Sequence, residues 1–224
     1  MSHPTPTEPA ARSGRLAAVR ETGVLAVVRA PGPDAAIGAA DALIRGGVTG
    51  IEVTYSTPEA PAVIAELRRR HGDRSLVGAG TVTTPAQAEE SAAAGAQFLV
   101  SPGTLPELTR AMLATRLVTM TGAMTPTEVM GAMALGVDVV KVFPASLGGP
   151  AFLKALREPF ADAVLMPTGG VTAENLAEFL AAGAIAVGAG GDLLARDALA
   201  AGDWDRIEAR ARDYAAALQA ARQS

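Results

Sequence analysis

The chain has 224 residues, of which 49% are hydrophobic and 19% charged, and its 19 basic and 23 acidic residues give a formal net charge of -4. This composition excludes intrinsic disorder for most of the chain, and the lack of any long basic run argues against a nucleic-acid partner. No stretch offers ~18 consecutive apolar residues without a charge, so we expect a soluble protein with no membrane span. Cysteine is absent, which excludes disulfides and thiolate metal sites and is typical of a cytoplasmic protein.

The N-terminal segment is rich in proline, with Pro4, Pro6 and Pro9, and it has no apolar region of the kind found in signal peptides. We therefore expect a disordered leader over residues 1–11. The remainder, residues 12–224, contains no linker and is expected to form a single domain.

From residue 23 onward, short β-rich runs alternate with Ala-rich helical segments. The expected strands are 23–29, 50–54, 76–79, 98–100, 117–120, 137–143, 163–166 and 184–187. The expected helices are 34–45, 57–70, 85–94, 105–115, 125–135, 150–157, 173–182 and 204–222. Eight such units predict a single-domain α/β fold, a (β/α)8 TIM barrel. The alternative is an open doubly wound sheet, which usually has a glycine-rich turn after its first strand, and residues 29–33 do not provide one.

Two of the expected strands carry a charged residue in a conspicuous position, Glu52 in strand two and Lys141 in strand six. A charge in a buried parallel strand is costly unless it has a partner or a function. Lys141 could be a strand-end residue that reaches solvent, or half of a structural ion pair with Glu52. Its place just before Pro144, near the C-terminal mouth where barrel enzymes act, favours a catalytic role.

The barrel geometry lets Glu52 and Lys141 cooperate. Strands two and six are diametrically opposite in a barrel of ~15 Å diameter, so two inward side chains would leave a gap for water or a small substrate. An amine and a carboxylate suit Schiff-base catalysis, in which the amine attacks a carbonyl and the carboxylate moves protons. Burial favours the neutral amine and an ionised Glu52 opposes it, and the sequence leaves this balance open.

Two glycine-rich clusters follow strands seven and eight, namely Thr168-Gly169-Gly170 and Gly190-Gly191. Barrels often bind phosphate at these two loops through backbone N–H groups. Each cluster alone is equally consistent with a tight turn, and Asp192 is an unfavourable neighbour for a phosphate dianion.

Four further residues end strands at the same mouth. Arg29 could contact a substrate carboxylate or phosphate, or could form a rim salt bridge. Thr81 could bind a small acid or be a turn residue, and Pro102 and Phe143 could line the mouth or simply pack. Neither histidine lies in a setting typical of a metal ligand, so no metal or cofactor is predicted.

Six short segments occur together in an order and spacing that is typical of one family. They are Ile51–Thr54, Gly78–Val82, Phe98–Pro102, Met124–Glu128, Lys141–Pro144 and Pro167–Val171. Over residues 23–194 the chain resembles the 2-keto-3-deoxy-6-phosphogluconate (KDPG) aldolases and the related 4-hydroxy-2-oxoglutarate (KHG) and 2-keto-3-deoxy-6-phosphogalactonate aldolases. The resemblance implies a metal-free class I aldolase on a (β/α)8 barrel, commonly a homotrimer. Such an enzyme cleaves a 2-keto-3-deoxy-6-phospho sugar acid to pyruvate and an aldehyde such as glyceraldehyde 3-phosphate.

The resemblance also implies roles for individual residues. Lys141 would form the Schiff base with pyruvate, Glu52 would be the general acid and base, partly through water, and Thr81 would bind the pyruvate carboxylate. The residues implied to hold the phosphate are Gly169, Gly170, Gly190 and Gly191.

The sequence departs from the family pattern at three places. Some members have an arginine where Ser56 stands, and here Arg29 would take over the anion contact. Many have serine where Gly191 stands, and Thr121-Gly122 replaces a Pro-Gly pair. The first two departures leave open whether substrate phosphate is required.

Two functions from other classes fit the same barrel. A phosphate-binding isomerase or synthase would need a metal cluster or a second acid/base at the mouth. A non-catalytic sugar-acid binder would use the Lys141–Glu52 pair only structurally, and would bind pyruvate without forming an imine.

Overall fold

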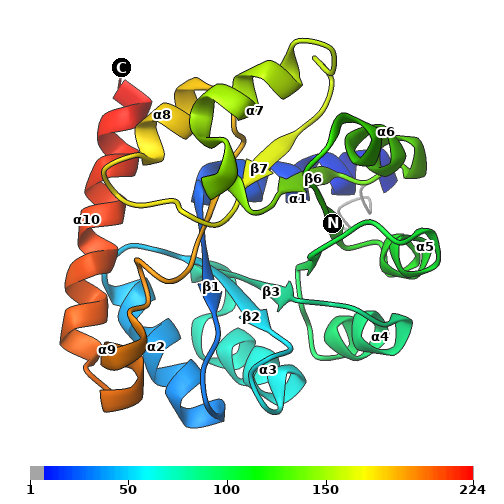
Figure 1. Ribbon diagram of the computed structural model, residues 1–224. Coiled ribbons are helices and arrows are strands. Elements are labelled where there is room, and N and C mark those ends of the chain that lie inside the picture. Colours follow the sequence, from blue (N-terminus) through cyan, green and yellow to red (C-terminus); the bar gives the residue numbers. More distant parts are fainter. Residues whose placement is uncertain (1–7, 224) are drawn as a thin grey trace, which may run out of the picture.

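Eight parallel strands alternating with helices form the centre of the computed structural model, which describes residues 8–223 (Figure 1). The strands are β1 Val24–Val28, β2 Gly50–Thr54, β3 Leu76–Gly80, β4 Phe98–Ser101, β5 Val118–Ala123, β6 Val139–Val142, β7 Leu165–Pro167 and β8 Val187–Ala189. Their order is β7-β6-β5-β4-β3-β2-β1-β8. Each strand therefore lies beside its sequence neighbours, which confirms the TIM barrel and excludes the reversal of a doubly wound sheet.

The barrel is closed between β7 and β8 by few backbone contacts. Thr168 and Gly188 form a parallel bridge at the C-terminal ends of these strands. The backbone N–H of Ile185 also donates to the carbonyl of Leu165 at 3.0 Å. The barrel is nearly closed, and its thinnest join lies beside the two glycine clusters.

Helices surround the barrel and begin where the sequence places capping residues and prolines. They are α2 Pro33–Arg45, α3 Ala60–His71, α4 Pro85–Ala93, α5 Pro106–Ala114, α6 Pro126–Leu135, α7 Gly149–Arg157, α8 Leu176–Ala181, α9 Arg196–Ala201 and α10 Trp204–Gln223, with 3-10 turns η1 Gly72–Arg74 and η2 Ala145–Leu147. Thr84 and Thr125 each form a capping box with the residue three positions later. Both satisfy backbone N–H groups that the first helical turn leaves without partners.

The apolar core has two parts. The larger part lies between the strands and the helices. The smaller part fills the barrel interior and includes Leu25, Phe98, Val118 and Val139. Val19 of helix α1 (Glu8–Thr22) is fully buried in the same interior cluster. Because Phe98, Val118 and Val139 are the first residues of their strands, α1 covers the N-terminal end of the barrel and leaves the opposite end for chemistry.

Helix α1 corrects one expectation from the sequence. Residues 8–11, which we expected to be disordered, form the start of this helix, while residues 1–7 lie outside the described residues. The prolines near its start made this segment resemble a disordered leader in the sequence. Burial of Val19 under the barrel stabilises the helix through tertiary packing. Among residues 8–223, no helix is long and apolar enough to cross a membrane.

Candidate active site

Lys141 on β6 and Glu52 on β2 meet inside the barrel. The Nζ atom of Lys141 lies 3.6 Å from Oε1 of Glu52, and the two side chains are only 7% and 0% exposed. The opposite positions expected for strands two and six therefore bring the charged groups into contact range. We expected a gap between the two side chains, but in this structure they form an ion pair.

The carboxylate of Glu52 has no other polar partner. Neither of its oxygens accepts a hydrogen bond from the described residues. A buried ion pair normally needs additional hydrogen bonds to offset the loss of hydration of its charges. Such a bare carboxylate is expensive as a purely structural element, and it is free to exchange protons with a bound molecule.

Glycines in the neighbouring strands allow close contacts around this pair. A Cβ atom at Gly80 of β3 would overlap the side chain of Glu52, and one at Gly122 of β5 would overlap the carbonyl of Pro102. Gly122 is in register with Lys141. The absence of a side chain at Gly80 provides the space that the Glu52 side chain occupies, and its absence at Gly122 lets the loop after β4 pack closely against β5.

The loop after β4 is held by Thr104, which sequence reasoning did not single out, together with Thr121, which was noted only as a departure from the family pattern. The hydroxyl of Thr104 donates toward Thr121 Oγ1 at 2.8 Å and toward the carbonyl of Gly122 at 2.9 Å. Thr121 is one of the positions where the chain departs from the family pattern. Its hydroxyl helps to hold the loop of Pro102 against β5, and Pro102 itself is exposed.

Phe143 lies beside the amine at the mouth of the barrel. Lys141 Nζ is 5.4 Å from the centre of the Phe143 ring, which is within the range of a cation–π contact. The ring is 42% exposed. A Cβ atom at Gly169 would lie 3.5 Å from it, so the ring extends from the amine toward the loop after β7.

Thr81 follows β3 with a backbone φ of 55°. A β-branched residue rarely adopts this left-handed conformation, which is found mainly where the surroundings enforce it, often in functional sites. Thr81 is half-buried. The strained backbone favours a binding role over that of an ordinary turn residue.

Arg29 follows β1 and is exposed. Within residues 8–223 it forms no ion pair, so the rim salt bridge considered from the sequence is absent from this part of the chain. The backbone on either side is held by β2 and its loop: Thr54 Oγ1 donates to the carbonyl of Val28 at 3.0 Å, and Ala30 N–H donates to Thr57 Oγ1 at 3.0 Å. Sequence reasoning missed Thr54 and Thr57, because only the fold brings them to β1.

The first glycine cluster forms a turn directly after β7. Gly169 and Gly170 have φ values of 90° and 76°, which favour glycine. Thr168 is buried and its Oγ1 atom has no hydrogen-bond partner among the described residues. The side-chain amide of Asn175 donates to the carbonyl of Gly170 at 2.9 Å, and this hydrogen bond helps to fix the conformation of the loop.

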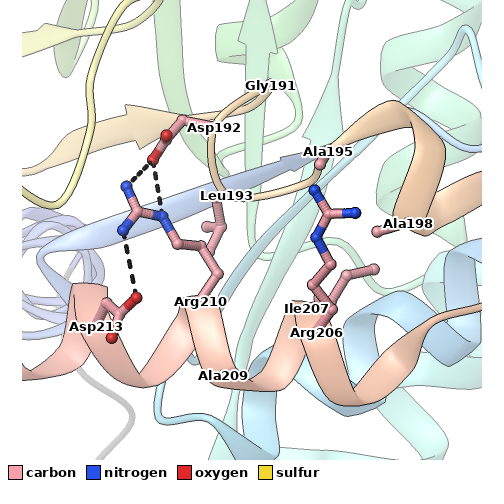
Figure 2. Close-up of a pocket in the computed structure, with 10 residues that line it drawn as sticks. All are labelled: Gly191, Asp192, Leu193, Ala195, Ala198, Arg206, Ile207, Ala209, Arg210 and Asp213. Carbon is pink, nitrogen blue, oxygen red and sulfur yellow. Dashed lines mark hydrogen bonds and ion pairs between the residues drawn. The ribbon is translucent and has the colours of Figure 1, made fainter.

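The second cluster, Gly190-Gly191, lies at the end of β8, next to β1. Asp192, the neighbour expected to repel a phosphate, turns its carboxylate toward α10, where Arg210 binds it (Figure 2). Tyr214 of α10 donates to the same carboxylate. A pocket of about 470 Å³ lies between this loop and α10 and is lined by Gly191, Arg206 and Arg210, among others. It lies outside the barrel, and it does not contain Lys141 or Glu52.

Apart from Glu52 and Lys141, which lie within β2 and β6, the residues named from the sequence thus follow the C-terminal ends of the strands, the end opposite α1. Within residues 8–223, no three His, Cys, Asp or Glu side chains gather into a group that could hold a metal ion. The ionisable groups inside the barrel here are an amine and a carboxylate, which suit covalent and acid–base chemistry.

Comparison with known proteins agrees with this geometry. The family model for KDPG and KHG aldolases matches residues 16–210. The chain belongs to this family.

Two relatives and one solved structure illustrate the similarity. The 2-dehydro-3-deoxy-phosphogluconate aldolase of Treponema pallidum is 38% identical over 193 residues, covering 86% of this chain and 91% of that protein. The 2-dehydro-3-deoxy-6-phosphogalactonate aldolase of Escherichia coli is 34% identical over 171 residues, covering 76% and 83%. A crystal structure of the KDPG aldolase from Legionella pneumophila, with pyruvate captured at low pH as a covalent carbinolamine intermediate, matches with a TM-score of 0.81 and 32% identity, covering 88% of this chain and 96% of that one.

Proposed function

We propose that this member of the family is a class I aldolase that reversibly cleaves a 2-keto-3-deoxy-6-phospho sugar acid to pyruvate and an aldehyde such as glyceraldehyde 3-phosphate. One observation carries the proposal: the buried amine of Lys141 lies 3.6 Å from a carboxylate that has no other partner. Family membership supports the same chemistry. KHG and 2-keto-3-deoxy-6-phosphogalactonate are the alternative substrates.

In the proposed reaction the neutral amine of Lys141 adds to the C2 ketone of the substrate, and loss of water gives an iminium. A base then removes the proton of the C4 hydroxyl. The C3–C4 bond breaks, its electron pair moves toward the iminium, and the aldehyde leaves. The remaining enamine takes up a proton at C3, and hydrolysis of the iminium releases pyruvate and the free lysine.

Glu52 is the group we assign to the proton transfers. It is the carboxylate nearest to Lys141, so it can take the proton that the amine must lose before attack. We propose that it also serves the substrate hydroxyl, partly through a water molecule.

The remaining contacts follow from the positions of the strand ends. We assign the pyruvate carboxylate to Thr81 and the wall of the mouth to Pro102 and Phe143. Arg29, exposed and without an ion pair among residues 8–223, is the cation available to a substrate anion.

The phosphate is assigned to the two glycine clusters, Thr168-Gly169-Gly170 and Gly190-Gly191. Both follow the strands at which barrels often bind phosphate, and Thr168 of the first cluster forms a bridge with Gly188, two residues before the second. A comparison of kcat/KM for phosphorylated and unphosphorylated 2-keto-3-deoxy acids tests this assignment, and equal values would contradict it.

Borohydride reduction in the presence of pyruvate tests the Schiff base. We expect a stable mass increase at Lys141, and no turnover or adduct in Lys141→Ala. The matched control is Lys154→Ala, because Lys154 is the other lysine of the chain and is exposed on α7. Pyruvate binding without any trapped adduct would favour a non-catalytic binder.

Glu52→Gln tests the carboxylate. We expect turnover to fall by about 10² to 10⁴-fold, as is typical when a general acid/base is lost, while borohydride still traps pyruvate on Lys141. Normal turnover of this variant would reject the role assigned to Glu52. The proposed reaction uses no metal, so loss of activity on treatment with EDTA would also count against it.

We further propose that the enzyme is a homotrimer in the cytoplasm. Three large apolar side chains are exposed on consecutive strand–helix units: Leu105 is 63% exposed, Met130 58% and Leu147 74%. Exposed apolar groups on neighbouring elements are typical of an interface between subunits. The absence of cysteine is consistent with a reducing compartment.

A further inference from the structure

The last helix, α10, binds both loops to which we assigned the phosphate. Tyr214 of α10 is fully buried, and its hydroxyl lies 2.9 Å from the carbonyl of Val171 in the β7 loop and 2.8 Å from Oδ2 of Asp192 in the β8 loop. One hydroxyl proton therefore serves acceptors on both loops. Burial, followed by the hydrogen bond to Asp192, raises the pKa of Tyr214 well above its ordinary value, so the hydroxyl stays protonated and donates.

Arg210, one turn before Tyr214, makes a second link between the same loops. Its guanidinium donates to Asp192 at 2.7 Å and to both oxygens of Glu174, in the β7 loop, at 3.0 and 3.1 Å. It also lies 3.3 Å from Asp213. Figure 2 shows the guanidinium between Asp192 and Asp213. Hydrogen bonds from Arg210 lower the pKa of Glu174 to about 2, so this carboxylate is ionised at neutral pH.

These contacts matter because of where the carboxylates lie. Asp192 directly follows Gly191, and Glu174 lies four residues after Gly170. A carboxylate turned toward a bound dianion would repel it. Arg210 is the cation that the structure places among the three carboxylates, and with Tyr214 it holds Asp192 toward α10.

We propose that Arg210 and Tyr214 are positioning residues for the substrate phosphate, and that they do so by keeping the carboxylate of Asp192 turned away from the Gly190-Gly191 loop. The proposal rests on the proposed function, since it assumes that these loops hold a phosphate. Neither side chain touches the reacting atoms. Their loss should therefore weaken recognition of the phosphate and leave the chemistry at Lys141 intact.

The test compares two substrates in each variant, 2-keto-3-deoxy-6-phosphogluconate and its unphosphorylated analogue. In Arg210→Gln we expect KM for the phosphorylated substrate to rise on the order of tenfold, while KM for the analogue and both kcat values change little. Inorganic phosphate should inhibit the variant less strongly than the wild type. Tyr214→Phe should raise KM for the phosphorylated substrate by a smaller factor. This variant provides the test if Arg210→Gln does not fold.

Two further variants separate charge and position from general packing. Arg206→Gln is the matched control, because Arg206 lies one turn earlier on α10 and makes a similar 2.7 Å pair with Asp197, outside the glycine loops. It should change neither KM. Adding Asp192→Asn to Arg210→Gln removes the carboxylate that Arg210 restrains, and should return much of the lost affinity for the phosphorylated substrate.

Borohydride trapping of pyruvate in every variant keeps the two proposals apart. Absence of trapping in the wild type would overturn the proposed function. Normal trapping together with an equal rise of both KM values in Arg210→Gln, or no recovery on adding Asp192→Asn, would overturn the positioning role alone.

Discussion

At the scale of single residues, the site combines a buried carboxylate that has a single ionic partner with a glycine that leaves space for it. Glu52 is fully buried and has Lys141 as its single polar neighbour among the described residues, at 3.6 Å. Its carboxylate lies over Gly80, where any Cβ atom would overlap it. Stability therefore does not explain this arrangement, whereas a proton-transfer role does.

Gly80→Ala tests the need for this space. The added methyl group must displace the Glu52 side chain, and we expect kcat to fall by up to about 10²-fold while the protein stays folded. Steady-state kinetics and circular dichroism provide the measurements. Gly131→Ala on α6 is the control, since a Cβ atom there meets nothing within 4 Å. Unchanged kcat in Gly80→Ala would show that the position of Glu52 is not critical.

Sequence reasoning could identify Glu52 and Lys141 because a charge in an apolar strand breaks a local rule. It could not identify Thr57, Arg210 or Tyr214. Their hydrogen bonds join residues that are 27, 18 and 43 positions apart, and nothing in the local pattern marks them. The contacts of such residues arise only when the barrel brings the strand ends together.

At the scale of elements, one segment that supported the family resemblance is a helix start. Met124–Glu128 forms the capping box of α6, in which Glu128 N–H donates to Thr125 Oγ1 and the backbone N–H groups of Met124 and Thr125 donate to Glu128. The hydrogen bonds that its carboxylate accepts lower the pKa of Glu128, the one from Met124 most strongly. Their contribution to stability is therefore complete above the unfolded-state pKa of this group and is lost as the pH falls through the lower folded-state pKa.

Thr125→Ala should destabilise the protein by about 1 kcal/mol, the usual cost of losing a helix cap. Urea unfolding at neutral pH measures the change. Thr127→Ala in the same first turn makes no capping bond and should be close to neutral. Equal losses in both variants would mean that the cap contributes nothing measurable.

The strand boundaries explain where pattern reading fell short. We expected strand five to end at Met120 and strand eight at Val187, yet β5 continues to Ala123 and β8 to Ala189. The added residues include Gly122 and Gly188, which are poor strand formers. Parallel pairing with the neighbouring strands extends β5 and β8 through these glycines. Residue composition alone does not indicate which segments pair in this way.

At the scale of the whole molecule, alternation of strands and helices was sufficient to predict the barrel, because eight regular units have few other ways to bury their strands. The exposed side chains Leu105, Met130 and Leu147 are not needed for that fold. Leu105 lies at the start of α5 and Met130 lies on α6, two helices across the barrel from α10, whereas Leu147 ends η2, just before α7 (Figure 1).

Met130→Glu should therefore weaken the proposed trimer without unfolding the subunit, because burying a charge in an apolar interface is costly. Light scattering after size-exclusion chromatography should show a shift from the mass of three chains toward that of one. Ala216→Glu, exposed on α10, should leave the mass unchanged. A wild-type protein with the mass of one chain would contradict the trimer.

The uneven exposure of the two lysines has a practical consequence. Lys154 is exposed on α7, whereas Lys141 is 5% exposed within the barrel. Amine-reactive dyes or resins should therefore couple to side chains through Lys154, so the enzyme can be immobilised or made fluorescent in its native state while its reactive amine stays unmodified.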